Sequence, residues 1–162
     1  MASNVSIFKA TPTDIKNLTE LDPKSDEGFF EDCFKRQCEI FIIQKGTIKA
    51  GYAVLNWEPK YALYKRLEYP EIQDLNILPK FQQQGLATKL IQYLENQVVQ
   101  TGKAGIGISV GLNKDFGAAQ RLYAKLGYIP DGMGATYDRV YVEMDQRYFI
   151  DDDLCLMLVK EF

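Results

Sequence analysis

The sequence predicts an α/β fold in which helices pack on a mixed β-sheet. Two observations carry this prediction: β-type apolar segments alternate with amphipathic segments of helical period, and Gly, Pro or Asp stand where the helices begin or end. The chain has 162 residues, 46% of them hydrophobic and 25% charged, so we expect residues 1–162 to form a single domain. No apolar run long enough for a membrane span and no signal peptide are expected.

The first third of the chain is expected to begin with a strand and two helices. An apolar strand at residues 5–9 precedes Thr-Pro-Thr-Asp at residues 11–14, where a capping residue, a proline and an acidic residue begin a helix. Within residues 27–38, Phe30 and Phe34 recur at a spacing of four, which predicts a second helix.

A hairpin and a loop follow these helices. Strands are expected at residues 39–44 and 48–57, joined by the Lys-Gly-Thr turn at residues 45–47. Residues 58–69 are rich in aromatic and charged side chains and are expected to form a loop.

The middle of the chain predicts a strand followed by a long helix. The strand covers residues 71–78 and ends at Pro79, and a glycine-containing turn at residues 82–87 begins a helix that reaches about residue 100. Its buried stripe repeats every fourth residue: Leu86, Leu90, Leu94 and Val98.

One more helix and several strands complete the order. The helix covers residues 115–126 and is ended by Gly127. The remaining strands are expected at residues 106–112, 128–130, 139–144 and 154–160.

Composition excludes several classes of chemistry. The chain contains no histidine, so triads and metal sites that need imidazole are excluded, and acid–base chemistry must use carboxylates, tyrosine, lysine, cysteine or water. The three cysteines, Cys33, Cys38 and Cys155, include no CxxC pair, so no metal site and no disulfide framework are expected. Cys33 and Cys38 are expected on or beside one helix as small hydrophobic residues. The expected compartment is the reducing cytoplasm. Nucleic-acid-binding proteins usually carry a basic face, and with a net charge of −3 none is expected here.

The segment Gln82-Gln83-Gln84-Gly85-Leu86-Ala87 has the features of a phosphate-binding turn. A glycine allows close approach of a ligand to the backbone, and the helix that follows directs its free N–H groups and positive dipole end to the same place. A plain strand-to-helix turn is the alternative interpretation.

Two motifs in order resemble the GNAT superfamily of N-acetyltransferases. The strand at residues 71–79 and the turn resemble its acetyl-CoA motif, Arg/Gln-x-x-Gly-x-Gly/Ala, with Gln82, Gly85 and Ala87 at the fixed positions. Asn113 and the run Leu122-Tyr123-Ala124-Lys125-Leu126-Gly127-Tyr128 resemble its second signature. The resemblance is to bacterial-type members of undefined substrate.

The resemblance implies a fold and an activity. The fold is a central, mostly antiparallel twisted sheet flanked by helices and splayed at the cofactor strand. The activity is direct transfer of an acetyl group from acetyl-CoA to a primary amine of a small molecule or peptide. The alternative is a catalytically weak acyl-CoA-binding regulatory module. The implied partners are acetyl-CoA and an amine acceptor, without nucleic acid, membrane or metal, and a homodimer is left open.

The resemblance also implies which residues hold acetyl-CoA. Backbone groups of the fourth strand pair with the pantetheine arm, amides of the turn hold the pyrophosphate, Asn113 bonds near the pantetheine, and Tyr123 stands near the sulfur. The cofactor-binding set is Leu75, Asn76, Ile77, Leu78, Gln82, Gln83, Gln84, Gly85, Leu86, Ala87, Thr88, Asn113 and Tyr123.

The reaction needs an acid, a base and an oxyanion donor. Tyr123 is the predicted acid for the leaving thiolate, with a packing tyrosine as the alternative reading. Glu71, fourteen residues before Gly85, is the predicted base, and Asp74 on the opposite face of the strand or ordered water are its alternatives. Both carboxylates can also be read as solvated residues at the strand edge. The N–H near Ile77 is the predicted oxyanion donor.

Charged and aromatic residues outside the motifs leave alternatives open. The family turn is often basic, whereas its first three positions here are glutamine, so only backbone groups remain to bind phosphate. The cations that either compensate or lie in solvent are Lys80, Lys89, Arg121 and Lys125. Trp57, Tyr61 and Tyr64 either wall an acceptor pocket or anchor their loop by packing. Asp151-Asp152-Asp153 either attracts a cationic acceptor or forms a solvated turn.

Overall fold

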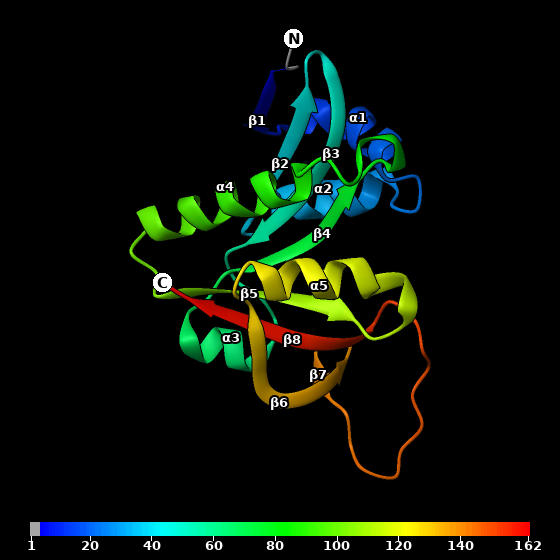
Figure 1. Ribbon diagram of the computed structural model, residues 1–162, viewed down its shortest axis with the longest axis vertical. Helices are drawn as coiled ribbons and strands as arrows, with labels where there is room; N and C mark the ends of the chain where they lie inside the picture. Colours follow the sequence, from blue (N-terminus) through cyan, green and yellow to red (C-terminus); the bar gives the residue numbers. More distant parts are fainter. Residues whose placement is uncertain (1–3) are drawn as a thin grey trace. The chain divides into compact units, whose positions relative to one another are not determined.

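The computed structural model describes residues 4–162 (Figure 1). The chain forms two compact units, one of Met1–Glu58 and Ile72–Gln97 and the other of Pro59–Glu71 and Val98–Phe162.

The first unit is a four-stranded arrangement with three α-helices. Its strands follow the order β1-β2-β3-β4, and both the β1–β2 and β2–β3 pairs are antiparallel. Its elements are β1 (Val5–Lys9), α1 (Ile15–Leu21), α2 (Glu27–Lys35), β2 (Cys38–Lys45), β3 (Ile48–Asn56), nearly all of β4 (Glu71–Ile77) and most of α4 (Leu86–Gln100).

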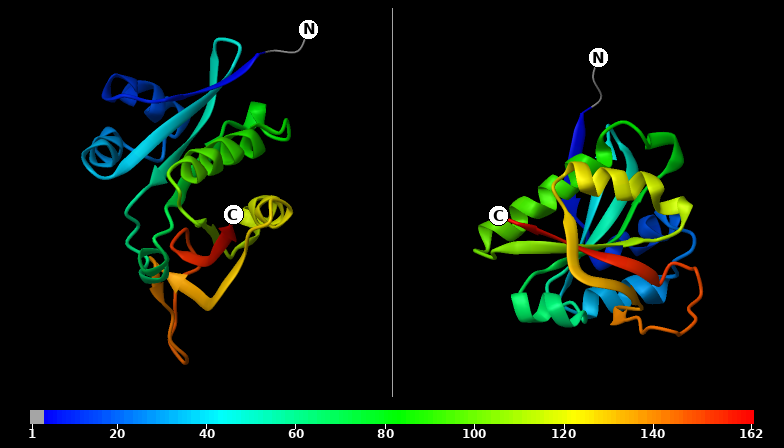
Figure 2. Two further views of the ribbon diagram at one scale, coloured as in Figure 1. Left: turned by 90° about the vertical axis from the view of Figure 1, so that its left-hand side faces the viewer. Right: turned by 60° about the horizontal axis from the view of Figure 1, so that its bottom comes forward.

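Helices cover both faces of the β2–β3 hairpin in this unit. Helices α1 and α2 lie on one face and α4 on the other (Figure 2). Because side chains alternate along a strand, Ile40 and Ile42 join the core cluster of α1 and α2, which contains Leu18 and Phe30. Phe41 points the other way, and its ring meets that of Tyr93 in α4 edge-on, with centroids 5.5 Å apart.

The second unit also has four strands, in the order β5-β8-β6-β7, with antiparallel neighbours throughout. Helix α3 lies on one face of β5 and β8, and α5 lies on the other (Figures 1 and 2). The elements of this unit are α3 (Ala62–Leu67), β5 (Gly105–Gly111), α5 (Gly117–Lys125), β6 (Ile129–Tyr137), β7 (Val140–Tyr141) and β8 (Leu154–Glu161).

A buried tyrosine joins α3 to the strands. Tyr64 is fully buried, and its hydroxyl donates to the carbonyls of Leu158 at 2.6 Å and Ile108 at 3.2 Å. Its ring lies so close to β5 that a Cβ at Gly107 would be 2.3 Å from ring atoms. Glycine at this position is therefore what allows α3 to pack on the sheet.

Three sequence predictions of local structure are wrong. Residues 58–69 are not only loop, because they contain α3. The helix predicted at residues 27–38 ends at Lys35, so Cys33 lies in α2 whereas Cys38 opens β2. The short strand at residues 128–130 extends as β6 to Tyr137, where pairing with β8 supplies the hydrogen bonds that its glycines and proline do not predict.

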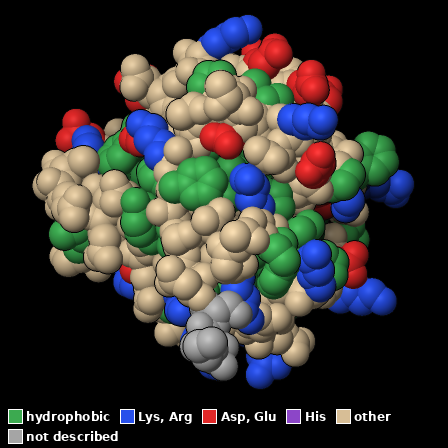
Figure 3. All heavy atoms as spheres, turned by 90° about the horizontal axis from the view of Figure 1, so that it is seen from above, with side chains coloured by type: hydrophobic (Ala, Val, Ile, Leu, Met, Phe, Trp, Pro, Cys, Tyr) green, Lys and Arg blue, Asp and Glu red, His purple; other side chains and the backbone are tan. Residues whose placement is uncertain are grey.

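The predicted α/β class with mostly antiparallel strands flanked by helices is confirmed, and the splay at the cofactor strand stays a prediction. On the face drawn in Figure 3, Lys and Arg side chains are separated by hydrophobic and uncharged surface and by Asp and Glu. None of the helices within residues 4–162 is both long and apolar enough to cross a membrane.

Candidate functional site

The turn before α4 contains two residues with left-handed backbone, and one of them has room around its Cβ position. Gln83 and Gly85 have φ of 58° and 77°, and a Cβ at Gly85 would meet nothing within 4 Å. The Lys89 N–H donates to the Gly85 carbonyl at 3.1 Å. The N–H groups of the first helical residues precede this bond and have no carbonyl one turn back, and they lie at the positive end of the helix dipole.

The glutamines of the turn shape it with their side chains. Gln82 Nε2 donates to the Ile77 carbonyl at 2.9 Å, which ties the turn to the end of β4. Gln84 Nε2 donates to the Lys80 carbonyl at 3.1 Å, and Gln84 Oε1 accepts from Lys45 Nζ at 2.7 Å. Lys45 comes from the end of β2. Sequence reasoning missed it because no local signal links it to a turn 39 residues away.

Strand β4 is irregular at its centre. Asp74 is exposed and has φ of 51°, so the regular alternation on which the opposite facing of Glu71 and Asp74 was predicted is interrupted there. Further along, Asn76 Nδ2 donates to the Leu21 carbonyl at 3.0 Å, and the Leu78 N–H donates to the Ala50 carbonyl at 2.8 Å. The Leu78 N–H is therefore occupied, and its carbonyl already accepts from the Phe81 N–H at 2.8 Å, so the predicted pairing of Leu78 with pantetheine would need the second lone pair of that carbonyl.

In the second unit, the end of α5 fixes Tyr123. Gly127 has φ of 93°, the Tyr128 N–H donates to the Tyr123 carbonyl at 3.0 Å, and the Gly127 N–H donates to the Ala124 carbonyl at 3.1 Å. These two bonds form a Schellman motif, and the rings of Tyr123 and Tyr128, 6.2 Å apart, supply its usual apolar contact. The second signature is thus a helix-ending device that holds Tyr123 in place.

Tyr123 is nearly buried, with 6% of its surface exposed. Burial raises the pKa of its phenol to about 12, so the hydroxyl keeps its proton at any ordinary pH. Its hydroxyl is therefore a protonated hydrogen-bond donor.

Asn113 has a structural role that the sequence did not predict. Its Oδ1 accepts from the Asp115 N–H at 2.8 Å and caps the short 3-10 helix Lys114–Phe116 that leads into α5. Gln120 then ties α5 to β5, because its Nε2 donates to the Gly111 carbonyl at 2.8 Å. The amide NH₂ of Asn113 is the part of this side chain left for the predicted bond near pantetheine.

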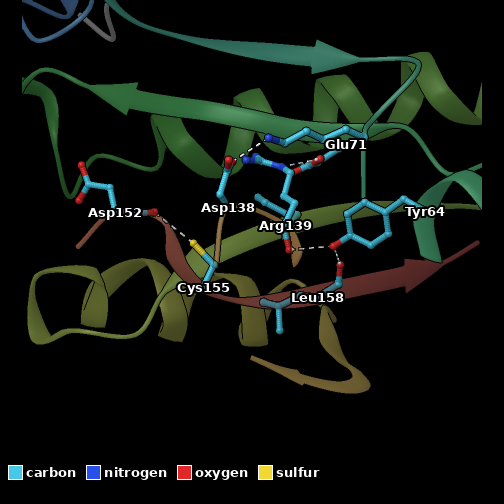
Figure 4. Close-up of polar contacts among 9 residues, drawn as sticks. Tyr64, Glu71, Asp138, Arg139, Asp152, Cys155 and Leu158 are labelled. Carbon is cyan, nitrogen blue, oxygen red and sulfur yellow. Dashed lines mark hydrogen bonds and ion pairs between the residues drawn. The ribbon is translucent and has the colours of Figure 1, made fainter. Parts of the chain in front are cut away.

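Glu71 is fully buried. Figure 4 shows its pairing with Arg139. Arg139 Nη2 lies 2.8 Å from Glu71 Oε1, and Arg139 Nε lies 3.0 Å and 3.2 Å from its two oxygens. Asp138 and Arg139 form the β6–β7 turn with φ of 45° and 63°, values that suit a type I′ hairpin turn, and Asp138 pairs with Lys60 at 2.8 Å. The reading of Glu71 as a solvated carboxylate is wrong.

The two loop tyrosines pack inside the second unit, whereas Trp57 and Asp151 have hydrogen-bond partners of their own. Tyr61 and Tyr64 are fully buried and meet edge-on at 4.7 Å, and the Tyr61 hydroxyl donates to Asp131. Asp151 accepts a hydrogen bond from the Tyr137 hydroxyl at 2.6 Å. This bond, together with backbone N–H groups, holds the pKa of Asp151 below its usual value. Trp57 Nε1 donates to Glu39 Oε1 at 2.5 Å in the first unit.

The sequence-predicted site residues divide between the units. Leu75–Leu78 and Gln82–Thr88 belong to the first unit, where Gln82 joins strand and turn, whereas Glu71, Asn113 and Tyr123 belong to the second. Within the part of the chain that the structure describes, no group of three or more Cys, Asp or Glu side chains could hold a metal ion.

Comparison with solved structures finds the same fold in acetyltransferases. The ribosomal-protein-S18-alanine N-acetyltransferase from Escherichia coli is 17% identical, with a TM-score of 0.73, over 98% of this chain and 94% of that one. A GNAT family acetyltransferase from Elizabethkingia anophelis with acetyl-CoA bound is 20% identical, with a TM-score of 0.68, over 98% and 99%. The yncA protein from Salmonella typhimurium with its cofactor acetyl-CoA is 17% identical, with a TM-score of 0.67, over 97% and 93%.

No curated protein matches the sequence. The model of the acetyltransferase (GNAT) family matches residues 6–128, which include the irregular strand, the open turn before α4 and the Schellman-capped Tyr123. The chain therefore belongs to the GNAT family of acetyltransferases.

Proposed function

We propose that this acetyltransferase moves the acetyl group of acetyl-CoA directly to a primary amine of a small molecule or peptide. The observation that carries donor binding is the turn at Gly85, where a left-handed backbone with room at the Cβ position leads directly into the N-terminus of α4. The amides from Gln83 to Thr88 hold the pyrophosphate, and the β4 backbone from Leu75 to Leu78 pairs with the pantetheine arm.

Tyr123 is the proposed acid for the departing thiolate. A thiol of ordinary pKa, about 8.5, is a stronger acid than the Tyr123 phenol, whose pKa burial raises to about 12, so the tyrosine serves mainly as a hydrogen-bond donor as negative charge develops on sulfur. Its burial keeps the hydroxyl protonated, and its Schellman-capped helix end holds it still. The N–H near Ile77 is the proposed donor to the thioester oxygen.

The acceptor amine must lose a proton, and Glu71 remains the proposed base. Because Glu71 has no exposed surface and both its oxygens face Arg139, a proton reaches it through ordered water or after Arg139 moves. Asp74, which is exposed, and water itself remain the alternatives. Glu71 can therefore act as the base only if water or a movement of Arg139 gives the proton access to its carboxylate.

A catalytically weak acyl-CoA-binding regulatory module is the second candidate. The observation in its favour is the turn itself, whose three glutamines carry no charge and are used in part to shape the backbone. The protonated hydroxyl of Tyr123, held at the capped end of α5, favours the enzyme.

Two measurements test the proposal. Acetyl-CoA at about 100 times its Kd should stabilise the fold by about 2.7 kcal/mol, seen as a rise in melting temperature. A panel of primary amines with acetyl-CoA should then release free thiol with at least one acceptor. Binding without thiol release from any amine would favour the regulatory module, and absence of binding in both thermal shift and calorimetry would refute both candidates.

A further inference from the structure

The turn that is proposed to hold pyrophosphate has no charged side chain of its own. Its positions 82–84 are glutamines, and the ammonium of the neighbouring Lys80 lies over the Phe81 ring, 5.2 Å from its centroid. Backbone N–H groups can bind a phosphate, but a cation strengthens such contacts through charge-assisted hydrogen bonds. The charge must therefore come from elsewhere in the fold or be missing.

We infer that Lys45 supplies this charge and is a binding residue for the pyrophosphate of the donor. The inference rests on the proposed binding of acetyl-CoA at Gln82–Thr88. Lys45 is half-buried at the end of β2, and its Nζ donates to Gln84 Oε1 at 2.7 Å, in the middle of the turn.

The direction of Lys45 follows from its hydrogen bond to the turn that begins α4. Phe41, four residues earlier on β2, meets Tyr93 of α4, but the pairing of β2 with β3 shifts register between Ile43 and Gln44, so the contact with Gln84 rather than alternation places Lys45. Its ammonium therefore lies at the start of that helix. The bond to Gln84 joins two segments 39 residues apart in sequence.

The Gln84 contact orients the ammonium without using it up. An ammonium has three N–H donors, and the amide oxygen of Gln84 takes one of them. A neutral acceptor competes weakly with a phosphate oxygen, which carries charge. Lys45 can thus hold Gln84 and a phosphate together, and Gln84, anchored to the Lys80 carbonyl, keeps the lysine at the turn.

The test compares three ligands that differ in phosphate content. Calorimetry measures the Kd of CoA, 3′-dephospho-CoA and pantetheine for wild type and for Lys45→Gln. We expect the substitution to weaken CoA and 3′-dephospho-CoA equally, by about 3- to 10-fold at low salt, and to leave pantetheine unchanged. Added salt should reduce this difference, because it screens the contact between exposed charges.

Lys49→Gln is the matched control. Lys49 lies in the same hairpin, on β3 opposite Gln44, and its loss removes the same charge. Its CoA affinity should equal that of wild type. In the double variant Lys45→Gln/Gln84→Arg, a cation returned to the turn should restore affinity, which a purely structural role of Lys45 does not allow.

Three results would overturn the inference: unchanged CoA affinity in Lys45→Gln, an equal loss in Lys49→Gln, or a loss for CoA that 3′-dephospho-CoA does not show. The third would move the lysine to the 3′-phosphate. If wild type itself binds neither CoA nor acetyl-CoA, the proposed function fails before the lysine is in question. Melting temperatures of the variants separate lost binding from lost folding.

Discussion

Glu71 and Arg139 form a bidentate ion pair in which the carboxylate is fully buried and the guanidinium is 24% exposed, with Nη2 and Oε1 2.8 Å apart. Glu71 begins β4, and Arg139 stands in the left-handed backbone of the β6–β7 turn. The pair offsets the strain of that turn and satisfies a charge that would otherwise be buried alone. A residue selected from the sequence for proton transfer is therefore also a structural anchor.

Breaking this pair should destabilise the fold from either side. Glu71→Gln leaves the guanidinium without its counter-ion, and we expect a loss of about 1–3 kcal/mol. Arg139→Gln should cost more, because the stranded carboxylate is the more buried group. The double variant should lose less than the sum of the two, as measured by urea denaturation. Lys60→Gln, which breaks the exposed pair with Asp138, should change little, and simple additivity at Glu71 and Arg139 would contradict the coupling.

The same residues separate a base from an anchor in the pH dependence of the rate. If Glu71 accepts the proton, Glu71→Gln lowers turnover most at neutral pH and recovers partly at high pH, where an amine of pKa near ~10.4 deprotonates unaided. Lys60→Gln, which leaves both Glu71 and Arg139 in place, should retain the wild-type shape of the profile. A wild-type shape in Glu71→Gln as well would assign the proton to water or Asp74.

Gly85→Glu should abolish CoA binding. The open space at Gly85 would receive an anionic side chain that occupies the phosphate position and repels the ligand. Gly102→Glu is the matched control, because Gly102 has φ of 79° and nothing within 4 Å of its Cβ position. Both variants carry the same backbone strain, so their melting temperatures should fall alike, and only Gly85→Glu should lose affinity in calorimetry. Normal affinity in Gly85→Glu would place the pyrophosphate elsewhere.

Tyr123→Phe should lower turnover by about 10²–10⁴-fold while the fold and the CoA affinity stay nearly intact. Phenylalanine keeps the ring that packs on Tyr128 and removes one hydroxyl, which is needed most as charge develops on sulfur. The loss should appear in kcat. Tyr128→Phe, which removes a hydroxyl from the neighbouring buried ring, should keep wild-type turnover. If Tyr123→Phe turns over normally but melts earlier, its hydroxyl is structural.

Alkaline pH should destabilise the protein. Burial raises the pKa of Tyr123 to about 12 and also raises the pKa of Tyr52, Tyr61 and Tyr64, whereas unfolded tyrosine ionises near ~10. The contribution is fully present below pH ~10 and is lost as pH rises through the folded pKa. Urea midpoints should therefore hold steady up to about pH 10 and fall as the pH rises from there toward about 12. Tyr123→Phe should show a smaller fall than wild type, and midpoints that do not change would contradict burial of these phenols.

Local rules in the sequence were sufficient for two parts of the site. The apolar stripe from Leu86 to Val98 and the glycine before it predicted α4 and its turn, because helix period and left-handed backbone are properties of neighbouring residues. Gly127 predicted the end of α5 for the same reason, and with it the place of Tyr123. Helix α3 escaped prediction because its burial depends on Gly107, a glycine in a distant strand.

The sequence by itself determined the family, the phosphate-type turn and the position of Tyr123 at a helix end. Only the tertiary structure decided that Glu71 is covered by Arg139, 68 residues away, and that Lys45 stands at Gln84, 39 residues away. The physical reason is that a turn or a helix cap is fixed by hydrogen bonds between residues close together in the sequence, so the residue types in that short segment predict it. The partner of a buried charge such as Glu71, or a cation that reaches a turn from another strand such as Lys45, depends on which strands and turns pack together. No pattern among neighbouring residues predicts this packing.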